Sequence, residues 1–171
     1  LDTRLAIAAD GRGSALRRLA GIGVRAVDYK QTAIVCAVAH EFPHDGIAHE
    51  RFLDGGPFAI LPMTDGPAGE HRSSIVWTER RSLAEHLMTL ARPVLERELA
   101  RRFGDFLGDL SIQGDTWSYP LSITAAKRLT GLRLALVGEA AHGMHPIAGQ
   151  GFNVSARDIE ALSQAVAKAI N

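Results

Sequence analysis

Apolar residues form short uninterrupted runs near both ends of the chain. Leu5–Ala9 has the length of a strand, and Leu132–Val137 is almost entirely apolar, as expected of a strand buried on both faces of a parallel sheet. Turn-forming residues follow each run, Asp10–Ser14 after the first and Gly138 with Glu139 after the second. This pattern predicts α/β structure at both ends of the chain.

The middle of the chain has a different residue pattern, in which short segments rich in β-branched and apolar residues alternate with Gly, Pro and Asp. Such closely spaced segments are typical of an antiparallel sheet. The predicted strands cover Tyr29–Ala39, Glu50–Leu53, Phe58–Met63, Ser73–Thr78 and Leu110–Leu121.

Helical spacing occurs in three places. Leucines at three- and four-residue steps predict helix over Leu83–Phe103, which Pro93 divides into two. A short helix is expected over Ala15–Ala20, with Ser14 as its N-cap. The last apolar stripe predicts a long amphipathic helix after Gly151. Ser155 with Asp158 would form a capping box for it, and Asn153 is the alternative cap. The stripe itself contains Ile159, Leu162, Val166 and Ile170.

These elements predict an α/β fold, α+β overall, in which one domain is contributed by both ends of the chain. Residues 1–28 and 115–171 would form a Rossmann-like α/β domain, and residues 29–114 would form an inserted, mainly antiparallel sheet domain with helices. The chain starts at Leu1 and stops directly after a helical pattern, so we expect it to be a fragment of a longer protein.

Composition narrows the class of protein. With 171 residues, 46% hydrophobic and 22% charged, the chain is long and apolar enough for a globular core. Lys and Arg number 19, as do Asp and Glu, so no basic excess favours a nucleic-acid partner. The single cysteine, Cys36, excludes an internal disulfide and suits a reducing compartment. No apolar run reaches the roughly 18 residues of a membrane span, and Leu1–Asp10 does not read as a signal peptide.

The strongest chemical signal begins where the second apolar strand ends. The strand delivers Glu139 to the carboxyl end of a sheet, where α/β folds bind ligands and where a carboxylate accepts hydrogen bonds from hydroxyl groups. Gly149 and Gly151 leave backbone N–H groups accessible, and the following helix directs the positive end of its dipole at the same place. The arrangement favours an anion or a polarised carbonyl.

This stretch resembles the second flavin-binding segment of the aromatic-ring monooxygenases that use FAD. The family has Asp where this chain has Glu139, and that acid contacts the ribityl chain of FAD. The longer side chain keeps the role only if the backbone or the ribityl chain shifts. The resemblance rests on Gly138-Glu139-Ala140-Ala141-His142, Pro146, Gly149-Gln150-Gly151, Asn153 and Asp158.

Two further stretches resemble the same family. Asp10-Gly11, with Ser14 and Arg17, is similar to its Asp-Gly motif, which lies near the FAD pyrophosphate and is implicated in nicotinamide use. Tyr29–Val35, His49–Leu53 and Gly56–Met63 are similar to the branch of these hydroxylases that acts in ubiquinone biosynthesis.

The resemblance implies a cofactor and a reaction. FAD would be bound, NAD(P)H would be the co-substrate, and a polyprenylated phenol would be hydroxylated with O₂. The two end segments would belong to the FAD-binding domain and the central sheet to substrate binding, with Phe58 a candidate for the substrate wall. No catalytic acid or base is assigned. The cofactor-binding candidates are Asp10, Gly11, Gly138, Glu139, Pro146, Gly149, Gln150, Gly151 and Asn153.

Two other classes of function stay open at this point. Another FAD-dependent oxidoreductase of the same fold, such as a polyprenyl reductase or a halogenase, would share the flavin motifs. A stand-alone, non-catalytic α/β binding domain would need no flavin. The expected location is cytoplasmic, with peripheral association with the inner membrane or with a biosynthetic complex left open, as is the oligomeric state.

The remaining conspicuous residues are expected to be structural. His142 and His145 lack further ligands, so no metal site is predicted. Cys36 lies inside a predicted strand and reads as a small core residue. His40, His44 and His49 are expected to be solvated, whereas core packing is expected for Trp77, Trp117 and Tyr119.

Overall fold

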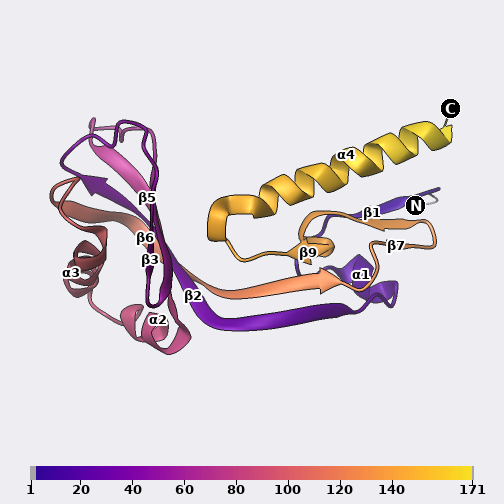
Figure 1. Cartoon of the computed structure of the whole chain (residues 1–171), viewed down its shortest axis with the longest axis horizontal. Coiled ribbons are helices and arrows are strands. Elements are labelled where there is room, and N and C mark those ends of the chain that lie inside the picture. The colour runs from indigo at the N-terminus through magenta and orange to yellow at the C-terminus, as the bar shows by residue number, and fades with distance from the viewer. Residues whose placement is uncertain (1–2, 171) are drawn as a thin grey trace. The chain divides into compact units, whose positions relative to one another are not determined.

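The computed structural model describes residues 3–170 and falls into two compact units, each considered by itself (Figure 1). The flanking unit comprises Leu1–Tyr29 and Ser122–Asn171, and the central unit comprises Lys30–Leu121. The boundaries between the units lie within two long strands, β2 (Val24–His40) and β6 (Leu110–Ala126). The division after Leu121 falls later than the one expected after residue 114, and β6 is continuous through both positions.

The flanking unit contains a three-stranded sheet in the order β1-β8-β7. β1 (Ala6–Ala8) pairs in parallel with β8 (Leu134–Leu136), and β7 (Thr130–Gly131) adds an antiparallel edge. All three residues of β8 are buried, as the apolar run predicted. The sheet is therefore mixed rather than parallel throughout. Its core contains Ala8, Ile22, Leu134, Leu136, Ala140 and Ala141.

Two helices belong to the flanking unit. α1 (Ala15–Leu19) begins at the predicted cap, because the Oγ of Ser14 accepts a hydrogen bond from the backbone N–H of Arg17 at 3.0 Å. α4 (Gln150–Ile170) begins earlier than expected, so the predicted caps at Asn153 and Ser155 are wrong. The Ser155 hydroxyl instead donates to the carbonyl of Gly151 at 2.9 Å, one turn back inside the helix.

The start of α4 has a simple physical reason. A short 3₁₀ turn, η2 (Ile147–Gly149), runs directly into the helix, so the chain is already helical before the residues that the sequence offered as caps. The turn is closed by a hydrogen bond from the N–H of Gly149 to the carbonyl of Pro146 at 2.9 Å.

The six-stranded antiparallel sheet has the strand order β3-β4-β5-β2-β6-β9. The central unit contains β3, β4, β5 and parts of β2 and β6, whereas β9 (His142–Gly143) pairs with the end of β6 that lies in the flanking unit. β3 (His49–Leu53), β4 (Gly56–Pro62) and β5 (His71–Arg80) form a meander, and β5 pairs with β2 over ten residues, from Gln31–Arg80 to His40–His71. The strands predicted from β-branched and apolar segments are present, and most extend beyond the predicted ends. β4 begins before the predicted Phe58 but ends at Pro62, before the predicted Met63.

Helices α2 (Arg81–Leu87) and α3 (Arg92–Phe103) cover one face of this sheet (Figure 1). The predicted break is confirmed: Pro93 lies in the first turn of α3, where its missing N–H has no helical partner to lose. Apolar side chains from one face of the sheet pack against both helices. This core contains Ile34, Cys36, Val38, Phe58, Ile60, Ile75, Trp77, Ala84, Leu87, Leu95, Leu99 and Phe103, with Leu107 and Ile112.

Several single-residue expectations are settled by burial. Cys36 is a core residue, as predicted, and burial raises the pKa of its thiol to about 11, so the thiol stays protonated. Trp77 is also in the core. Trp117 and Tyr119 are 57% and 54% exposed, so core packing was the wrong expectation for both. They lie on β6, where strand alternation does not reveal which positions another element covers.

His40 contradicts the expectation of a solvated side chain, because it is buried. Its Nδ1 lies 2.8 Å from the carbonyl oxygen of Phe42 and its Nε2 lies 3.0 Å from the Oγ of Ser73. Burial is the largest cause of a pKa below the ordinary value for histidine. His44 and His49 are partly exposed.

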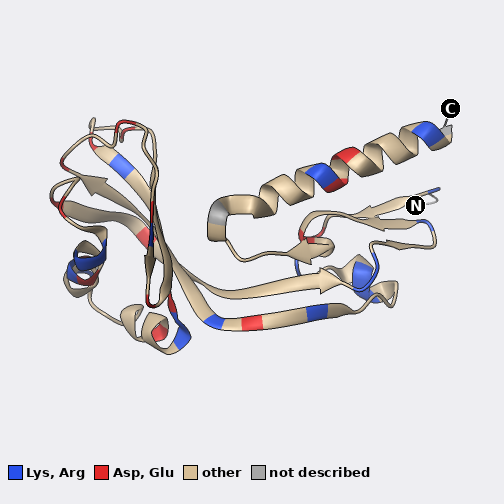
Figure 2. Ribbon diagram, in the orientation of Figure 1, with Lys and Arg blue, Asp and Glu red and all other residues tan. Residues whose placement is uncertain are grey.

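Charged residues of both signs are spread over α3 and the loops, consistent with a net charge of zero (Figure 2). Of the helices described, none has the length and apolar character needed to cross a membrane.

Candidate functional site

The candidate site begins with two loops that leave the same edge of the β1-β8-β7 sheet. β1 and β8 are parallel, with Ala8 opposite Leu136, and the N–H of Val137 donates to the carbonyl of Ala8 at 3.0 Å. The segments that follow these strands, Asp10–Ser14 and Gly138–Ala140, therefore start side by side. The parallel pairing thus brings together two motifs that are about 130 residues apart in the sequence.

Asp10 holds the first loop in place. Its Oδ2 accepts hydrogen bonds from the backbone N–H groups of Ala15 at 2.8 Å and Leu16 at 3.2 Å, at the start of α1. A hydrogen bond from Ser14 and those from the backbone amides lower the pKa of the carboxyl group, and Ser14 makes the largest contribution. Asp10 is thus engaged with α1 rather than directed away from the loop.

The Asp10 contacts predict a pH dependence of stability. A carboxyl whose pKa is lower in the folded state stabilises the fold above its unfolded pKa of about 3.9, and the contribution is lost as the pH falls through the folded pKa. Asp10→Asn should therefore destabilise the protein at neutral pH, and the difference from wild type should shrink below about pH 4. Urea unfolding at several pH values measures this, with Asp115→Asn, at an exposed position on β6, as the matched control.

A destabilisation by Asp10→Asn that persists unchanged at pH 3 would contradict this role for the ionised carboxylate. An equal effect of Asp115→Asn at every pH would show that loss of any carboxylate produces the same change.

Two arginines tie the loops together. Arg17 is only 5% exposed, and its guanidinium donates to the carbonyl of Ala140 at 2.7 Å and to that of Arg12 at 2.8 Å. Arg12 in turn forms an ion pair with Glu139 at 2.9 Å and donates to the Oγ of Ser122 at 3.2 Å. The loop after β1 is thereby fastened to the loop after β8.

Glu139 keeps a surface available to a ligand despite its ion pair. The side chains of Arg12 and Glu139 are 36% and 55% exposed, and exposed ion pairs contribute only about 0–1 kcal/mol. A hydroxyl group that approaches Glu139 therefore competes with a weak interaction. The residue lies in the 3₁₀ turn η1 (Gly138–Ala140), where Gly138 has a φ of +60°.

The two glycines at the start of α4 differ in backbone conformation. Gly149 has a φ of +60°, which side chains rarely adopt, whereas Gly151 lies in the first turn of the helix without a positive φ. A Cβ at either position would meet no atom of the chain within 4 Å, and the same holds at Gly11 and Gly13. The backbone is therefore open to a ligand at both loops.

The other two residues predicted at this end of α4 contact each other. The side-chain amide of Asn153 donates to the Oε1 of Gln150 at 3.3 Å, on the first turn of the helix. Pro146 precedes η2 and starts the turn that leads into α4.

The site also contains a pair that the sequence did not predict. The Nε2 of His142, on β9 (His142–Gly143), is hydrogen bonded to the carboxylate of Asp158 on α4. Three residues after His142, the ring of His145 contacts the ring of Tyr29 edge-on, with 5.1 Å between the ring centroids. Burial lowers the pKa of His145 below its ordinary value. No local spacing links positions 142 and 158, so only the fold reveals this pairing.

Phe58 is placed away from any ligand-accessible surface. It is 0% exposed and packs against Trp77, with 6.3 Å between ring centroids, on the sheet face that α2 and α3 cover. A ring with no exposed surface offers a substrate nothing to contact in this structure.

These residues fit a flavin nucleotide. Open glycine backbone at two adjoining loops leaves room for a flat ligand and a pyrophosphate, a partly exposed carboxylate can accept hydroxyl groups, and the N-terminus of a 21-residue helix favours negative charge. Within residues 3–170, no cluster of three or more His, Cys, Asp or Glu side chains is arranged to hold a metal ion.

The fold and these loops define a flavin-binding protein, and comparison with known families agrees. The chain belongs to the FAD-binding domain family, whose model matches residues 1–171. The family membership predicted from the motifs is confirmed.

Within this family, the chain is similar to two named hydroxylases. It is 52% identical over 161 residues to the ubiquinone hydroxylase UbiL of Rhodospirillum rubrum, covering 94% of this chain and 36% of that protein. It is 35% identical over 162 residues to the 3-demethoxyubiquinol 3-hydroxylase of Escherichia coli, covering 95% and 40%. The chain thus spans well under half the length of these relatives.

Solved structures share the fold. PqsL of Pseudomonas aeruginosa, described as a probable FAD-dependent monooxygenase, superposes with a TM-score of 0.75 at 26% identity, covering 98% of this chain and 46% of that one. The flavin-dependent halogenase CmlS superposes with a TM-score of 0.72 at 20% identity, covering 90% and 28%, which shows the fold alone.

Proposed function

We propose that this chain forms part of an FAD-dependent hydroxylase that acts on a polyprenylated phenol, a precursor of ubiquinone. The observation that carries the proposal is the convergence of Asp10–Gly11 and Gly138–Glu139 at one sheet edge, beside open glycine backbone. The similarity to two ubiquinone hydroxylases supports the reaction class. NAD(P)H as reductant and association with a membrane surface or a biosynthetic complex are further parts of the proposal.

Each segment has a distinct role in the proposal. When bound, FAD supplies the redox chemistry that activates O₂ for hydroxylation. Glu139 would accept hydrogen bonds from ribityl hydroxyl groups, exchanging part of its ion pair with Arg12 for them. The N–H groups around Gly149 and Gly151, with the positive end of α4, would stabilise negative charge on the flavin ring. Asp10 and Gly11 would shape the loop beside the pyrophosphate.

The substrate wall is assigned to the sheet face opposite α2 and α3. On that face Val35 lies directly opposite Val76, which in turn lies opposite Ala59, so three small apolar side chains form a row across adjacent strands. All three are partly exposed, whereas their neighbours on the other face are buried. This row provides an apolar surface for a phenolic ring and replaces Phe58 in the proposal.

Substitutions in the intact protein test the flavin site. Gly151→Val places a branched side chain in open space without demanding a positive φ, so the fold should persist and FAD affinity should fall about tenfold or more through a steric clash. Fluorescence titration of the apoprotein with FAD measures the affinity, thermal unfolding measures the fold, and turnover of a polyprenylated phenol measures the activity. Ala161→Val, at an exposed position of the same helix, is the matched control.

Unchanged FAD affinity in Gly151→Val would place the flavin away from α4. A flavin-loaded protein that does not hydroxylate any phenol would retain the site but refute the reaction. Gly149→Val is a poorer probe, because its φ of +60° makes loss of folding an expected result.

A further inference from the structure

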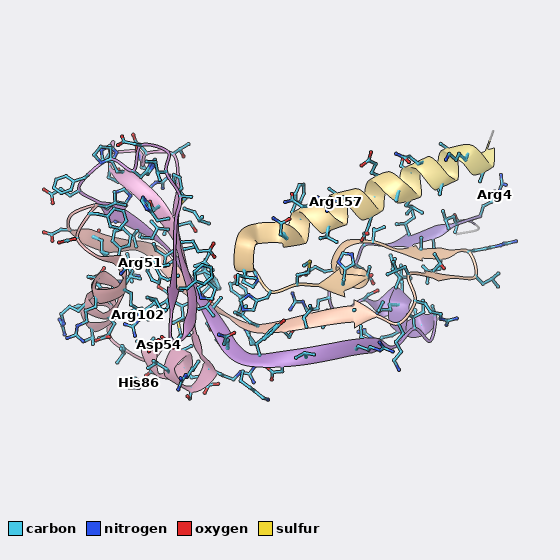
Figure 3. The ribbon with its side chains drawn as sticks, in the orientation of Figure 1. Arg4, Arg51, Asp54, His86, Arg102 and Arg157 are labelled. Carbon is cyan, nitrogen blue, oxygen red and sulfur yellow. The ribbon has the colours of Figure 1, made fainter. Side chains whose placement is uncertain are left out.

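A cleft of about 610 Å³ lies in the central unit where the β3–β4 turn meets α2 and α3. It is formed by residues of the central unit alone and shares no residue with the loops assigned to FAD. Two of its residues, Asp54 and Arg102, are labelled in Figure 3. The lining consists of Phe52, Leu53, Asp54, Gly55, Glu79, Arg80, Leu83 and Arg102.

A buried carboxylate forms the floor of this cleft. The side chain of Glu79 is 9% exposed, and its Oε1 accepts a hydrogen bond from the N–H of Arg80 at 3.0 Å. It lies against the β3–β4 turn so closely that a Cβ at Gly55 would come within 2.0 Å of Oε1. The turn glycine is therefore required for the position of the carboxylate.

A guanidinium group faces the same carboxylate without reaching it. Arg102 lies over the ring of Trp77, with its Cζ 4.4 Å from the ring centre, and its Nη1 donates to Glu98 Oε2 at 3.1 Å. The Nη2 of Arg102 is 3.8 Å from the Oε2 of Glu79, too far for a direct hydrogen bond. A hydroxyl group to one side of these two atoms would accept from the guanidinium and donate to the carboxylate, whereas an ether can only accept and a hydrocarbon does neither.

The remainder of the lining defines the body of the ligand. Phe52 is 72% exposed and Leu83 is 37% exposed, so a ligand there would remove large apolar side chains from water. The lining contains two carboxylates, Asp54 and Glu79, and two guanidinium groups, those of Arg80 and Arg102. Glu98, which pairs with Arg102, is also paired with Arg101, so the charges around the cleft still cancel. This balance of charge favours a neutral molecule.

We propose that the cleft is a binding site for a small neutral alcohol with an apolar body. The hydroxyl group bridges Arg102 and Glu79, and the apolar body lies against Phe52, Leu53 and Leu83. Glu79 projects from the same strand face as Ile75 and Trp77, the face that packs against the helices. The site is therefore separate from the row of Val35, Ala59 and Val76, and it does not rest on the proposed hydroxylase activity.

Tryptophan fluorescence tests the proposal with 1-hexanol as the probe and 1-methoxyhexane, its methyl ether, as the matched compound. The alcohol should bind about tenfold more tightly than the ether, because only the alcohol donates to the carboxylate. Binding should change the emission of Trp77, so the signal should survive in Trp117→Phe and disappear in Trp77→Phe. Isothermal titration calorimetry gives the affinities independently.

Variants separate the polar contact from the apolar one. Glu79→Gln should reduce the preference for the alcohol over the ether, whereas Glu85→Gln, at an exposed position of α2, should leave it intact. Phe52→Ala should weaken both compounds by a similar factor, and its exposed position keeps the fold intact even if Glu79→Gln does not fold. Equal affinity for alcohol and ether in the wild-type protein, or an emission change that depends on Trp117 alone, would overturn the proposal.

Discussion

Replacing Phe58 with alanine is expected to lower the free energy of unfolding by about 3–5 kcal/mol, the range for deleting a buried phenyl ring. The ring is 0% exposed and packs against Trp77 beneath α2 and α3. Its removal takes apolar area out of the core and leaves a cavity that strands of a paired sheet cannot close. Urea unfolding followed by circular dichroism measures the change.

Phe52→Ala is the matched control, because it makes the same chemical change six residues earlier at a side chain that is 72% exposed. Its effect should stay within about 0.5 kcal/mol. If Phe58→Ala instead left stability unchanged and raised only the KM for a phenolic substrate, Phe58 would belong to the substrate wall after all.

The burial of Phe58 shows what the alternation of side chains along a strand does and does not determine. The period of two places Phe58 and Ile60 on one face of β4 and Ala59 and Leu61 on the other. It does not say which face the helices cover. That choice depends on where α2 and α3 return to the sheet, and their short connection after β5 is not encoded in the pattern of β4 itself.

The two loops proposed to bind flavin were predictable as loops because their signals are local. A buried strand followed by glycines and a helix is contiguous in the sequence, and so is Asp10 with the Ser14 cap. The interactions that assemble the loops are not local. Arg12 meets Glu139 across 127 positions and Arg17 meets Ala140 across 123, so neither pairing has a spacing that a sequence pattern could reveal.

The prediction of the residues that cap α4 was wrong for a different reason. The residues that usually cap helices, Asn153 and Ser155, are present, but η2 has already set a helical backbone before them. Capping propensity expresses a preference that tertiary context overrides, here because the chain enters α4 from a 3₁₀ turn. The two glycines there also differ in backbone conformation. Position 149 has a positive φ that favours glycine, whereas position 151 has no positive φ.

Arg17→Met is expected to lower the free energy of unfolding by about 3–5 kcal/mol, comparable with the loss at Phe58. Methionine keeps much of the side-chain volume but cannot donate the hydrogen bonds to Ala140 and Arg12. Both acceptors are carbonyl groups held by one buried cation, so the substitution unfastens two loops at once. Chemical denaturation of wild type and variant measures the difference.

Arg18→Met provides the comparison, since Arg18 is exposed on the same short helix and its change should cost less than about 1 kcal/mol. Retention of FAD in the intact protein is a second readout, because the Arg17 contacts align the loop after β1 with the loop after β8. Glu139→Gln should lower FAD affinity without a comparable loss of stability, as its ion pair is exposed. If Arg17→Met were as stable as Arg18→Met, the parallel strands alone would hold the two loops together.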